Sequence, residues 1–255
     1  MLRGNRPSRL APQLALVFLI ASSVAGALAI DSPQPTGATF ARTSPYSMIG
    51  QLRFVSGSDY YVGSGTAILP KAVLTAAHNL WDPQTGWSRR ILFIRSKYDD
   101  AGLSRQLASR KYILGGYSSA ALRYGGNSSY AFANDMGGLR FLNPLAGGLH
   151  AGWRADVPSL TGADYNIALG YGAETHSGDE LLFVEPTQSF YVVIGGYLNN
   201  DSILAEGGMS GGPVMAPNPS DVLEVVGVVV SGSTDGAGIR AIDAKAARFI
   251  RANLR

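Results

Sequence analysis

A serine in a glycine-rich segment is the residue of this sequence best suited to chemistry. Ser210 lies in the segment EGGMSGGPVM, between Gly208 and the pair Gly211 and Gly212. A serine that attacks a carbonyl needs backbone N–H groups directed at the developing oxyanion, and glycines allow the tight turn that directs them. We therefore expect Ser210 to be a nucleophile, with the N–H groups of Gly208 and Ser210 as the oxyanion hole. An ordinary glycine-rich turn between strands is the alternative.

A histidine far upstream could activate this serine. His78 ends the segment VLTAAH, in which an apolar run is followed by small residues. Small residues before a histidine let the imidazole lie against a neighbouring strand and reach across a cleft, as a general base must. A lone histidine at the end of a strand is usually structural. The glycine-flanked serine further along the chain favours the catalytic interpretation.

The order of these residues along the chain separates the known kinds of serine hydrolase. Residues 208–212 also match G-x-S-x-G, the nucleophile elbow of α/β-hydrolases, in which the catalytic histidine follows the serine. Here all three histidines of the sequence precede Ser210. The subtilisin order requires an aspartate before His78, where only two aspartates are available. The order therefore argues against both of these folds.

The elements that must position these residues are predominantly β-strands. From residue 46 to about residue 240, short β-prone runs are separated by Gly, Asn, Asp and Pro. This spacing indicates an all-β barrel or sandwich and argues against alternating βαβ units. Asp243 can cap a following amphipathic helix, expected over about residues 243–254. The apolar residues that share one face of this helix are Ala246, Phe249, Ile250 and Leu254.

The amino terminus has the pattern of an export signal. Three arginines precede the apolar run Leu14–Ala21, and small residues follow as far as Ala29. This order predicts a signal peptide over residues 1–29 and a secreted or periplasmic protein. Pro12 shortens the apolar stretch below the roughly 20 residues that span a bilayer, so we expect no membrane association after cleavage. Residues 30–45 mix Pro, Gly, Ser and Thr and are interpreted as a linker or pro-segment.

Composition excludes several classes of function. The chain has no cysteine, which excludes disulfides, thiol chemistry and cysteine–zinc sites. Its three histidines leave little room for a metal site, and we predict no metal and no cofactor. Of the 21 Lys and Arg residues three lie in the predicted signal, and the remaining 18 balance 18 Asp and Glu. No basic stripe of the kind that binds nucleic acid is present.

Together, the motifs LTAAH and GMSGGPV resemble those of the trypsin and chymotrypsin superfamily. The cysteine-free context of GSGTAIL and VLTAAHN is similar to its bacterial glutamyl endopeptidase-like exported branch, and the resemblance covers most of residues 46–254. It implies two six-stranded antiparallel Greek-key β-barrels, at about residues 46–155 and 156–240, with a C-terminal α-helix. It also implies a monomeric, secreted serine endopeptidase acting on protein or peptide substrates.

The resemblance requires a third catalytic residue between His78 and Ser210. Asp135 begins the segment DMGGLRF, which matches the Asp-apolar-Ala-apolar-apolar pattern of the superfamily only loosely. We choose Asp135, which would hold the imidazole tautomer and stabilise the imidazolium while staying ionised. Asp99 or Asp100 is the alternative, although both lie in a segment typical of an exposed turn.

The resemblance also places substrate-binding residues. Leu204, six residues before the serine, corresponds to the base of the primary specificity pocket, and its apolar side chain argues against cleavage after Lys or Arg. Val230, Ser231 and Gly232 should lie beside the substrate backbone. Val229 stands where glutamate-specific relatives carry a histidine, so we expect a preference for apolar side chains. A non-catalytic homologue that acts as a binding protein, or hydrolysis of esters or lipids by the same residues, are the alternative functions.

Overall fold

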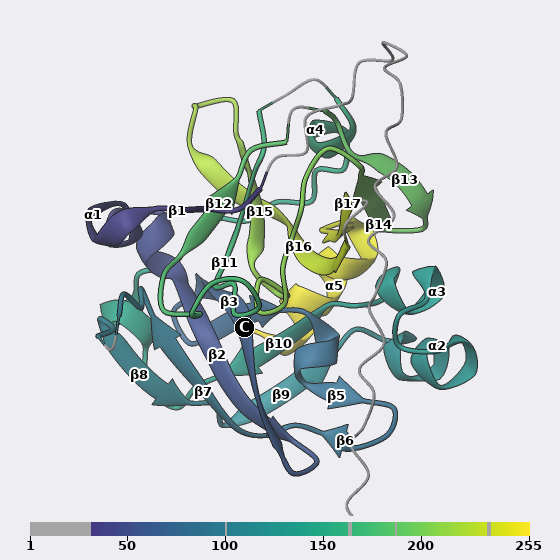
Figure 1. Ribbon diagram of the computed structural model, residues 1–255, viewed down its shortest axis with the longest axis horizontal. Coiled ribbons are helices and arrows are strands. Elements are labelled where there is room, and N and C mark those ends of the chain that lie inside the picture. The colour runs from purple at the N-terminus through teal and green to yellow at the C-terminus, as the bar shows by residue number, and fades with distance from the viewer. Residues whose placement is uncertain (1–31, 100, 163–164, 187, 234–235) are drawn as a thin grey trace, which may run out of the picture.

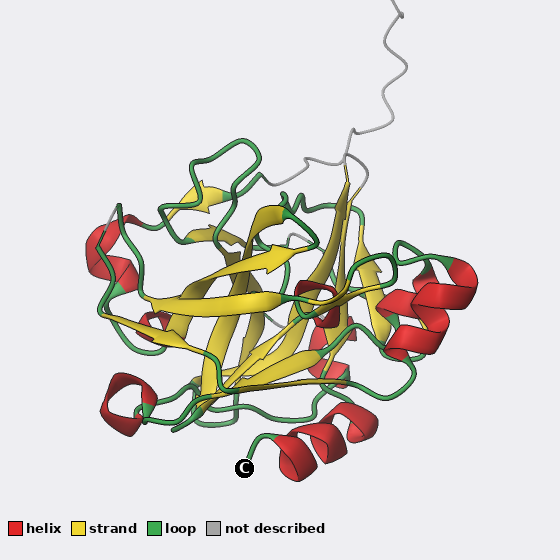
Figure 2. Ribbon diagram, turned by 90° about the horizontal axis from the view of Figure 1, so that it is seen from below, coloured by secondary structure: helices red, strands yellow, loops and turns green. Residues whose placement is uncertain are grey.

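The computed structural model describes residues 32–99, 101–162, 165–186, 188–233 and 236–255. Within these ranges the strands form two large antiparallel sheets, and helices lie around the outside (Figures 1 and 2). The predicted signal peptide, residues 1–29, lies outside the described residues. None of the helices in the described ranges is long and apolar enough to cross a membrane.

The first sheet forms the N-terminal barrel. Its strands are β2 (Ile49–Ser56), β3 (Asp59–Leu69), β4 (Ala72–Thr75), β7 (Arg89–Arg95), β8 (Ser104–Leu107), β9 (Arg110–Ile113) and β10 (Gly137–Arg140). They lie in the order β8-β7-β2-β3-β4-β10-β9. The turn between β2 and β3 contains Gly57 at a φ of +61°, a backbone region that favours glycine. Beside this sheet, β5 (Trp81–Asp82) and β6 (Gly86–Trp87) form a small separate hairpin.

The second sheet forms the C-terminal barrel. Its strands are β1 (Gln34–Pro35), β11 (Ile167–Gly170), β12 (Leu182–Val184), β13 (Tyr191–Ile194), β14 (Tyr197–Asn200), β15 (Pro213–Pro217), β16 (Leu223–Ser233) and β17 (Gly236–Ala241). Their order is β1-β12-β11-β15-β16-β17-β14-β13. The two-barrel, all-β prediction is confirmed, with the barrels separating between residues 140 and 167. The described sheets have seven and eight strands instead of six each, because strands of two to four residues extend their edges.

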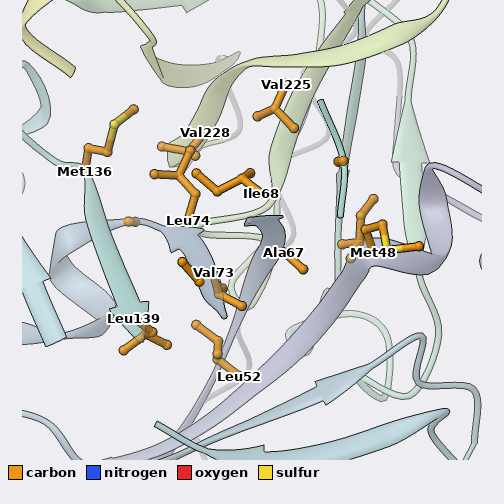
Figure 3. Packing of buried hydrophobic residues seen from close by; sticks show 14 of the residues in the cluster. Met48, Leu52, Ala67, Ile68, Val73, Leu74, Met136, Leu139, Val225 and Val228 are labelled. Atoms are coloured by element: carbon orange, nitrogen blue, oxygen red, sulfur yellow. The ribbon is translucent and has the colours of Figure 1, made fainter. Parts of the chain in front are cut away.

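One hydrophobic core spans the contact between the barrels. Leu52, Leu74 and Leu139 of the N-terminal barrel belong to the same buried cluster as Val225 and Val228 of β16, as Figure 3 shows. A second buried cluster fills the interior of the C-terminal barrel. Burial of apolar surface is the main favourable contribution to folding in a protein without disulfides. The shared cluster therefore holds the two barrels, and the residues at their junction, in a fixed arrangement.

The predicted C-terminal helix is present as α5 (Ala244–Asn253). The side chain of Asp243 accepts a hydrogen bond from the N–H of Ala246 at 2.8 Å, as expected of an N-cap. All four apolar residues predicted for its inner face are buried. The shorter helices are α1 (Gly37–Ala41), α2 (Tyr117–Tyr124), α3 (Ser129–Phe132) and α4 (Pro158–Thr161), with 3₁₀ turns η1 (Tyr46–Met48), η2 (Ala77–Asn79) and η3 (Leu145–Gly148).

Residues 34–45 pack against both barrels. β1 pairs with β12 of the C-terminal barrel, and the ring of Phe40 stacks on Tyr46 with centroids 3.9 Å apart. Ala41 is fully buried, and its carbonyl accepts a hydrogen bond from Ser96 of the N-terminal barrel. This part of the predicted linker or pro-segment is therefore integrated into the fold. Its removal during maturation stays a prediction.

Candidate active site

His78 and Asp135 form a hydrogen-bonded pair at the ends of two neighbouring strands. His78 lies in η2 just after β4, and Asp135 lies two residues before β10, which pairs with β4. The Nδ1 atom of His78 is 2.6 Å from Oδ2 of Asp135, and the backbone N–H of His78 donates to Oδ1 at 2.9 Å. The Asp135 side chain is fully buried, whereas 31% of the His78 side chain is exposed. The carboxylate thus holds His78 by one hydrogen bond to its ring and one to its backbone, and leaves Nε2 available.

The glycines after Asp135 explain why this segment departs from the pattern of the superfamily. A Cβ added at Gly137 would lie 2.7 Å from Leu80 and 3.1 Å from the carbonyl oxygen of Ala76. A Cβ at Gly138 would lie 2.5 Å from Leu254, at the end of the C-terminal helix. Side chains in these positions would push β10 away from η2 and from the helix. Glycine therefore permits the close packing that brings Asp135 to the histidine.

The aspartate controls the protonation of His78. Burial on its own lowers the pKa of His78, because it disfavours the charged imidazolium. The negative charge of Asp135 and its hydrogen bond to Nδ1 outweigh this effect, so the pKa of His78 is raised above its ordinary value of 6.5. The raised pKa makes His78 a stronger base, as the uptake of a proton from a hydroxyl requires.

Ser210 belongs to the C-terminal barrel, but residues of the N-terminal barrel hold it by hydrogen bonds. Its carbonyl oxygen accepts the N–H of Ser64 at 2.8 Å and the side-chain amide of Asn79 at 2.9 Å. Gly211, which follows, has a φ of +85°, and a Cβ there would lie 2.4 Å from the carbonyl oxygen of Ser64. Since Asn79 is the neighbour of His78, these contacts place the serine loop beside the histidine.

The backbone N–H groups of Gly208 and Ser210 are free to bind an anion. Neither N–H donates to an acceptor within the described part of the chain. Gly208 has a φ of +100°, which only glycine adopts readily, and its carbonyl oxygen accepts the Ser64 hydroxyl at 2.8 Å. Ser64, which the sequence did not single out, therefore fixes the backbone of this turn. Two preoriented donors next to a serine are what stabilisation of an oxyanion requires.

His78 and Ser210 both line one large open groove, which has a volume of about 1080 Å³. The groove also includes Gly208, and residues of both barrels form its walls. No hydrogen bond joins the imidazole of His78 to the hydroxyl of Ser210 in the described structure. Such bonds are often long before substrate binds, so this spacing is compatible with proton transfer in the complex.

The fold is shared with solved structures of serine proteases. A Glu endopeptidase in complex with MPD is 18% identical, with a TM-score of 0.68, over 88% of this chain and 98% of that chain. The protease Anisep from Arthrobacter nicotinovorans is 18% identical, with a TM-score of 0.63, over 82% and 95%. The scabies mite inactivated protease paralogue S-I1 is 16% identical, with a TM-score of 0.61, over 82% and 95%. No known family profile and no curated protein matches the sequence.

The chain has the chymotrypsin-like serine protease fold. At identities of 16% and 18% these likenesses concern the architecture alone. What the groove can do must therefore be argued from the residues of this chain.

Within the chymotrypsin-like fold, the end of β16 forms one side of the groove. Val229, Val230, Ser231 and Gly232, all predicted to bind substrate, line the groove. The backbone of Val229 is already used, since it accepts the N–H of Gly211 at 2.7 Å and donates to the carbonyl of Gly212 at 2.9 Å. Among the described residues, Ser231 and Gly232 pair only with β17, so their other edge can receive an extended peptide.

Leu204 is not among the described residues that line the groove. Its neighbour Ala205 lines it instead, and Leu204 is half-buried. Ala205 approaches Gly232 so closely that a Cβ on Gly232 would lie 1.9 Å from the Ala205 carbonyl oxygen. The assignment of Leu204 to the base of the pocket stays a prediction. The alignment of sequence positions alone could not reveal the close contact between Ala205 and Gly232.

Glu206 contributes to the site although the sequence analysis did not select it. Its buried carboxylate accepts hydrogen bonds from the N–H and hydroxyl of Thr175 and lies 3.1 Å from Nδ1 of His176. Burial raises the pKa of Glu206, but these bonds outweigh it and hold the pKa below its ordinary value. The carboxylate thus ties the start of the serine loop to residues 173–176. Its position four residues before Ser210 was the only signal in the sequence.

The alternative acids do not reach the histidine. Asp99 is exposed, has a φ of +50°, and its carbonyl oxygen accepts a hydrogen bond from Lys97. Asp100 lies outside the described residues. Of the aspartates that are described, only Asp135 accepts hydrogen bonds from His78.

Proposed function

We propose that this protein is a secreted serine endopeptidase that cleaves peptide bonds through His78, Asp135 and Ser210. The observation that carries the proposal is that His78, held by the buried Asp135, lines the same groove as Ser210 and Gly208, whose N–H groups donate to no acceptor among the described residues. The fold of the solved proteases supports peptide substrates, and the signal-like residues 1–29 support export.

The residues of the groove can perform acyl transfer in two steps. Nδ1–H of His78 donates to Asp135, so Nε2 is the free base that takes the proton of the Ser210 hydroxyl as Oγ attacks the scissile carbonyl. The N–H groups of Gly208 and Ser210 stabilise the oxyanion. His78 then gives the proton to the leaving amine, which breaks the peptide bond and leaves an acyl-enzyme. Water activated by His78 hydrolyses this ester and regenerates Ser210.

An activity-based probe tests the nucleophile directly. The mature protein should react with a fluorophosphonate at Ser210, whereas S210A should remain unlabelled, and mass spectrometry of the labelled peptide identifies the residue. Trypsin under the same conditions is the positive control for the probe. Absence of labelling in folded wild type would count against catalysis and favour the binding-protein alternative, since one neighbour of the same fold is described as an inactivated protease paralogue.

The substrate class is tested separately from the nucleophile. We expect cleavage of denatured casein by wild type and none by S210A, because peptide hydrolysis requires the same acyl transfer that the probe reports. Hydrolysis of small esters without cleavage of casein would instead indicate an esterase that uses the same three residues.

A further inference from the structure

The groove that contains His78 and Ser210 has walls of one charge sign. No Lys or Arg is found among its described lining residues. Five carboxylates line it, and they come from both barrels. These acidic residues are Asp59, Asp82, Glu174, Asp201 and Glu206.

Four of these carboxylates have no cationic partner. Asp59, Asp82, Glu174 and Asp201 form no ion pair within the described ranges, whereas Glu206 is paired with His176. Each of the four accepts hydrogen bonds from uncharged donors with one oxygen, and the other oxygen has no donor among the described residues. The hydroxyl of Ser58 donates to Asp59, and the N–H of Gly207 donates to Glu174. Asp82 accepts the N–H groups of Gln84 and Thr85 and the hydroxyl of Thr85. Asp201 accepts hydrogen bonds from Tyr191 and Asn199.

The four free carboxylates lie on both walls of the groove. Asp59 begins β3 and Asp82 lies in β5, beside the N-terminal barrel. Glu174 follows β11 and Asp201 follows β14, in the C-terminal barrel. In Figure 1, β5 and β14 lie on the same side of the molecule, below and above the level of α3. A peptide that crosses the groove past Ser210 therefore meets negative charge from each barrel.

We propose that this groove selects cationic polypeptides, with Lys or Arg residues on both sides of the scissile bond. Charges of one sign in a cleft with low-dielectric walls concentrate the electrostatic field, so the carboxylates of this groove attract positively charged groups. The free oxygens supply acceptors for ammonium and guanidinium groups. The inference rests on the proposed peptidase function. It concerns substrate residues further along the peptide on either side of the scissile bond, and not the side chain directly beside the attacked carbonyl.

Matched substrates and variants test the selection. Three fluorogenic peptides share one scissile bond and carry Lys residues on the amino-terminal flank, on the carboxyl-terminal flank, or on neither. The enzyme variants are D59N/D82N and E174Q/D201N, which keep an oxygen acceptor at each position. The control is D221N, which removes a charge from the exposed turn between β15 and β16, away from the groove. Asn tolerates the φ of +60° at that position.

Wild type should cleave each Lys-flanked peptide with a kcat/KM at least about fivefold above that of the neutral peptide, as expected for two exposed charge contacts. Each double variant should lose this preference on one flank and keep it on the other, while D221N keeps both. The preference should shrink when ionic strength rises from about 0.05 M to about 0.5 M. Equal kcat/KM for all three peptides, or equal preference in all variants, would overturn the inference.

A binding measurement separates this inference from the proposed function. S210A retains the groove, so it should bind the Lys-flanked peptides more tightly than the neutral peptide in fluorescence anisotropy. If wild type neither reacts with the fluorophosphonate nor cleaves any peptide, but S210A shows this preference, the peptidase function fails and the selection stands. If wild type cleaves peptides without regard to flanking charge, the selection fails and the peptidase function stands.

Discussion

At the scale of single residues, the contact between Asp135 and His78 determines what the groove can do. The carboxylate holds the imidazole by its ring nitrogen and by its backbone, and it raises the pKa of His78 against the opposing effect of burial. As a consequence, the protonated histidine that the proposed acyl transfer requires is stabilised inside the protein. Without that charge the same burial would favour the neutral ring throughout.

The variant D135N should separate these contributions. Burial then acts alone, so the pKa of His78 should fall below its wild-type value, and the tautomer that leaves Nε2 free is no longer favoured. We expect kcat/KM to fall by about four orders of magnitude. In wild type, activity should rise with pH through a midpoint above 6.5, the ordinary histidine value, as His78 loses its proton. NMR titration of the imidazole measures the shift, and an unchanged midpoint in D135N would contradict this account.

At the scale of elements, the C-terminal helix is linked to the last strand by a buried cation. Arg240 of β17 is 1% exposed, and its guanidinium lies 3.0 Å from Asp243, the residue that caps α5. Asp243 therefore has two roles, as a helix cap and as the counter-ion of a buried charge. Leu254 at the end of the same helix packs against Gly138 of β10, so the helix supports the strand next to Asp135.

Replacing Asp243 should destabilise the protein through both roles. We expect D243A to lower the free energy of unfolding by about 3 kcal/mol, because a helix cap and the partner of a buried charge are lost together. D243N keeps the cap, so it should lose less.

Burial raises the pKa of Asp243, but hydrogen bonds from Ala246 and Arg240 outweigh it and lower the pKa. The difference in the free energy of unfolding between wild type and D243A should therefore be largest above the ordinary carboxyl pKa, and it should decrease as pH falls through the lowered pKa of Asp243. Urea unfolding at several pH values measures it. Equal losses in both variants would contradict the contribution of the cap, and no loss of stability in D243N would contradict the role of Asp243 as counter-ion of Arg240.

At the scale of the whole molecule, the site depends on contacts between the two barrels. Ser64 of the N-terminal barrel bonds Gly208 and Ser210 of the C-terminal barrel, and the shared hydrophobic cluster holds the same junction. Residues 34–45 add a third connection, since they pair with β12 and contact Ser96. The residues proposed to be catalytic are thus positioned by an interface and not by either barrel alone.

Removal of residues 34–45 tests this third connection. A protein that begins at Tyr46 should lose the β1 pairing and the packing of Phe40, and we expect about 2 kcal/mol less stability than in a protein that begins at Ser32. Calorimetry of the two proteins measures the difference. Equal melting temperatures, with higher activity in the shorter protein, would instead favour the interpretation of this segment as a pro-segment.

The sequence alone determined the features that depend on local pattern. Short β-prone runs with turn residues predicted an all-β barrel or sandwich, and the resemblance of the two motifs implied that there are two barrels. The spacing of apolar residues after Asp243 predicted the terminal helix, because helix periodicity is visible within one segment. The glycines around Ser210 and the position of His78 before Ser210 also led to a prediction from the sequence, because each of the two residues lies in a short motif.

The tertiary structure decided the features that join distant segments. That Asp135 reaches His78 depends on close packing at two glycines, and the Ser64 and Glu206 contacts link residues of different loops. The acidic lining arises the same way, because carboxylates far apart in the sequence meet at one groove. Hydrogen bonds and electrostatic interactions depend on the distance between atoms in space and not on separation along the sequence, so only the folded chain determines which residues interact.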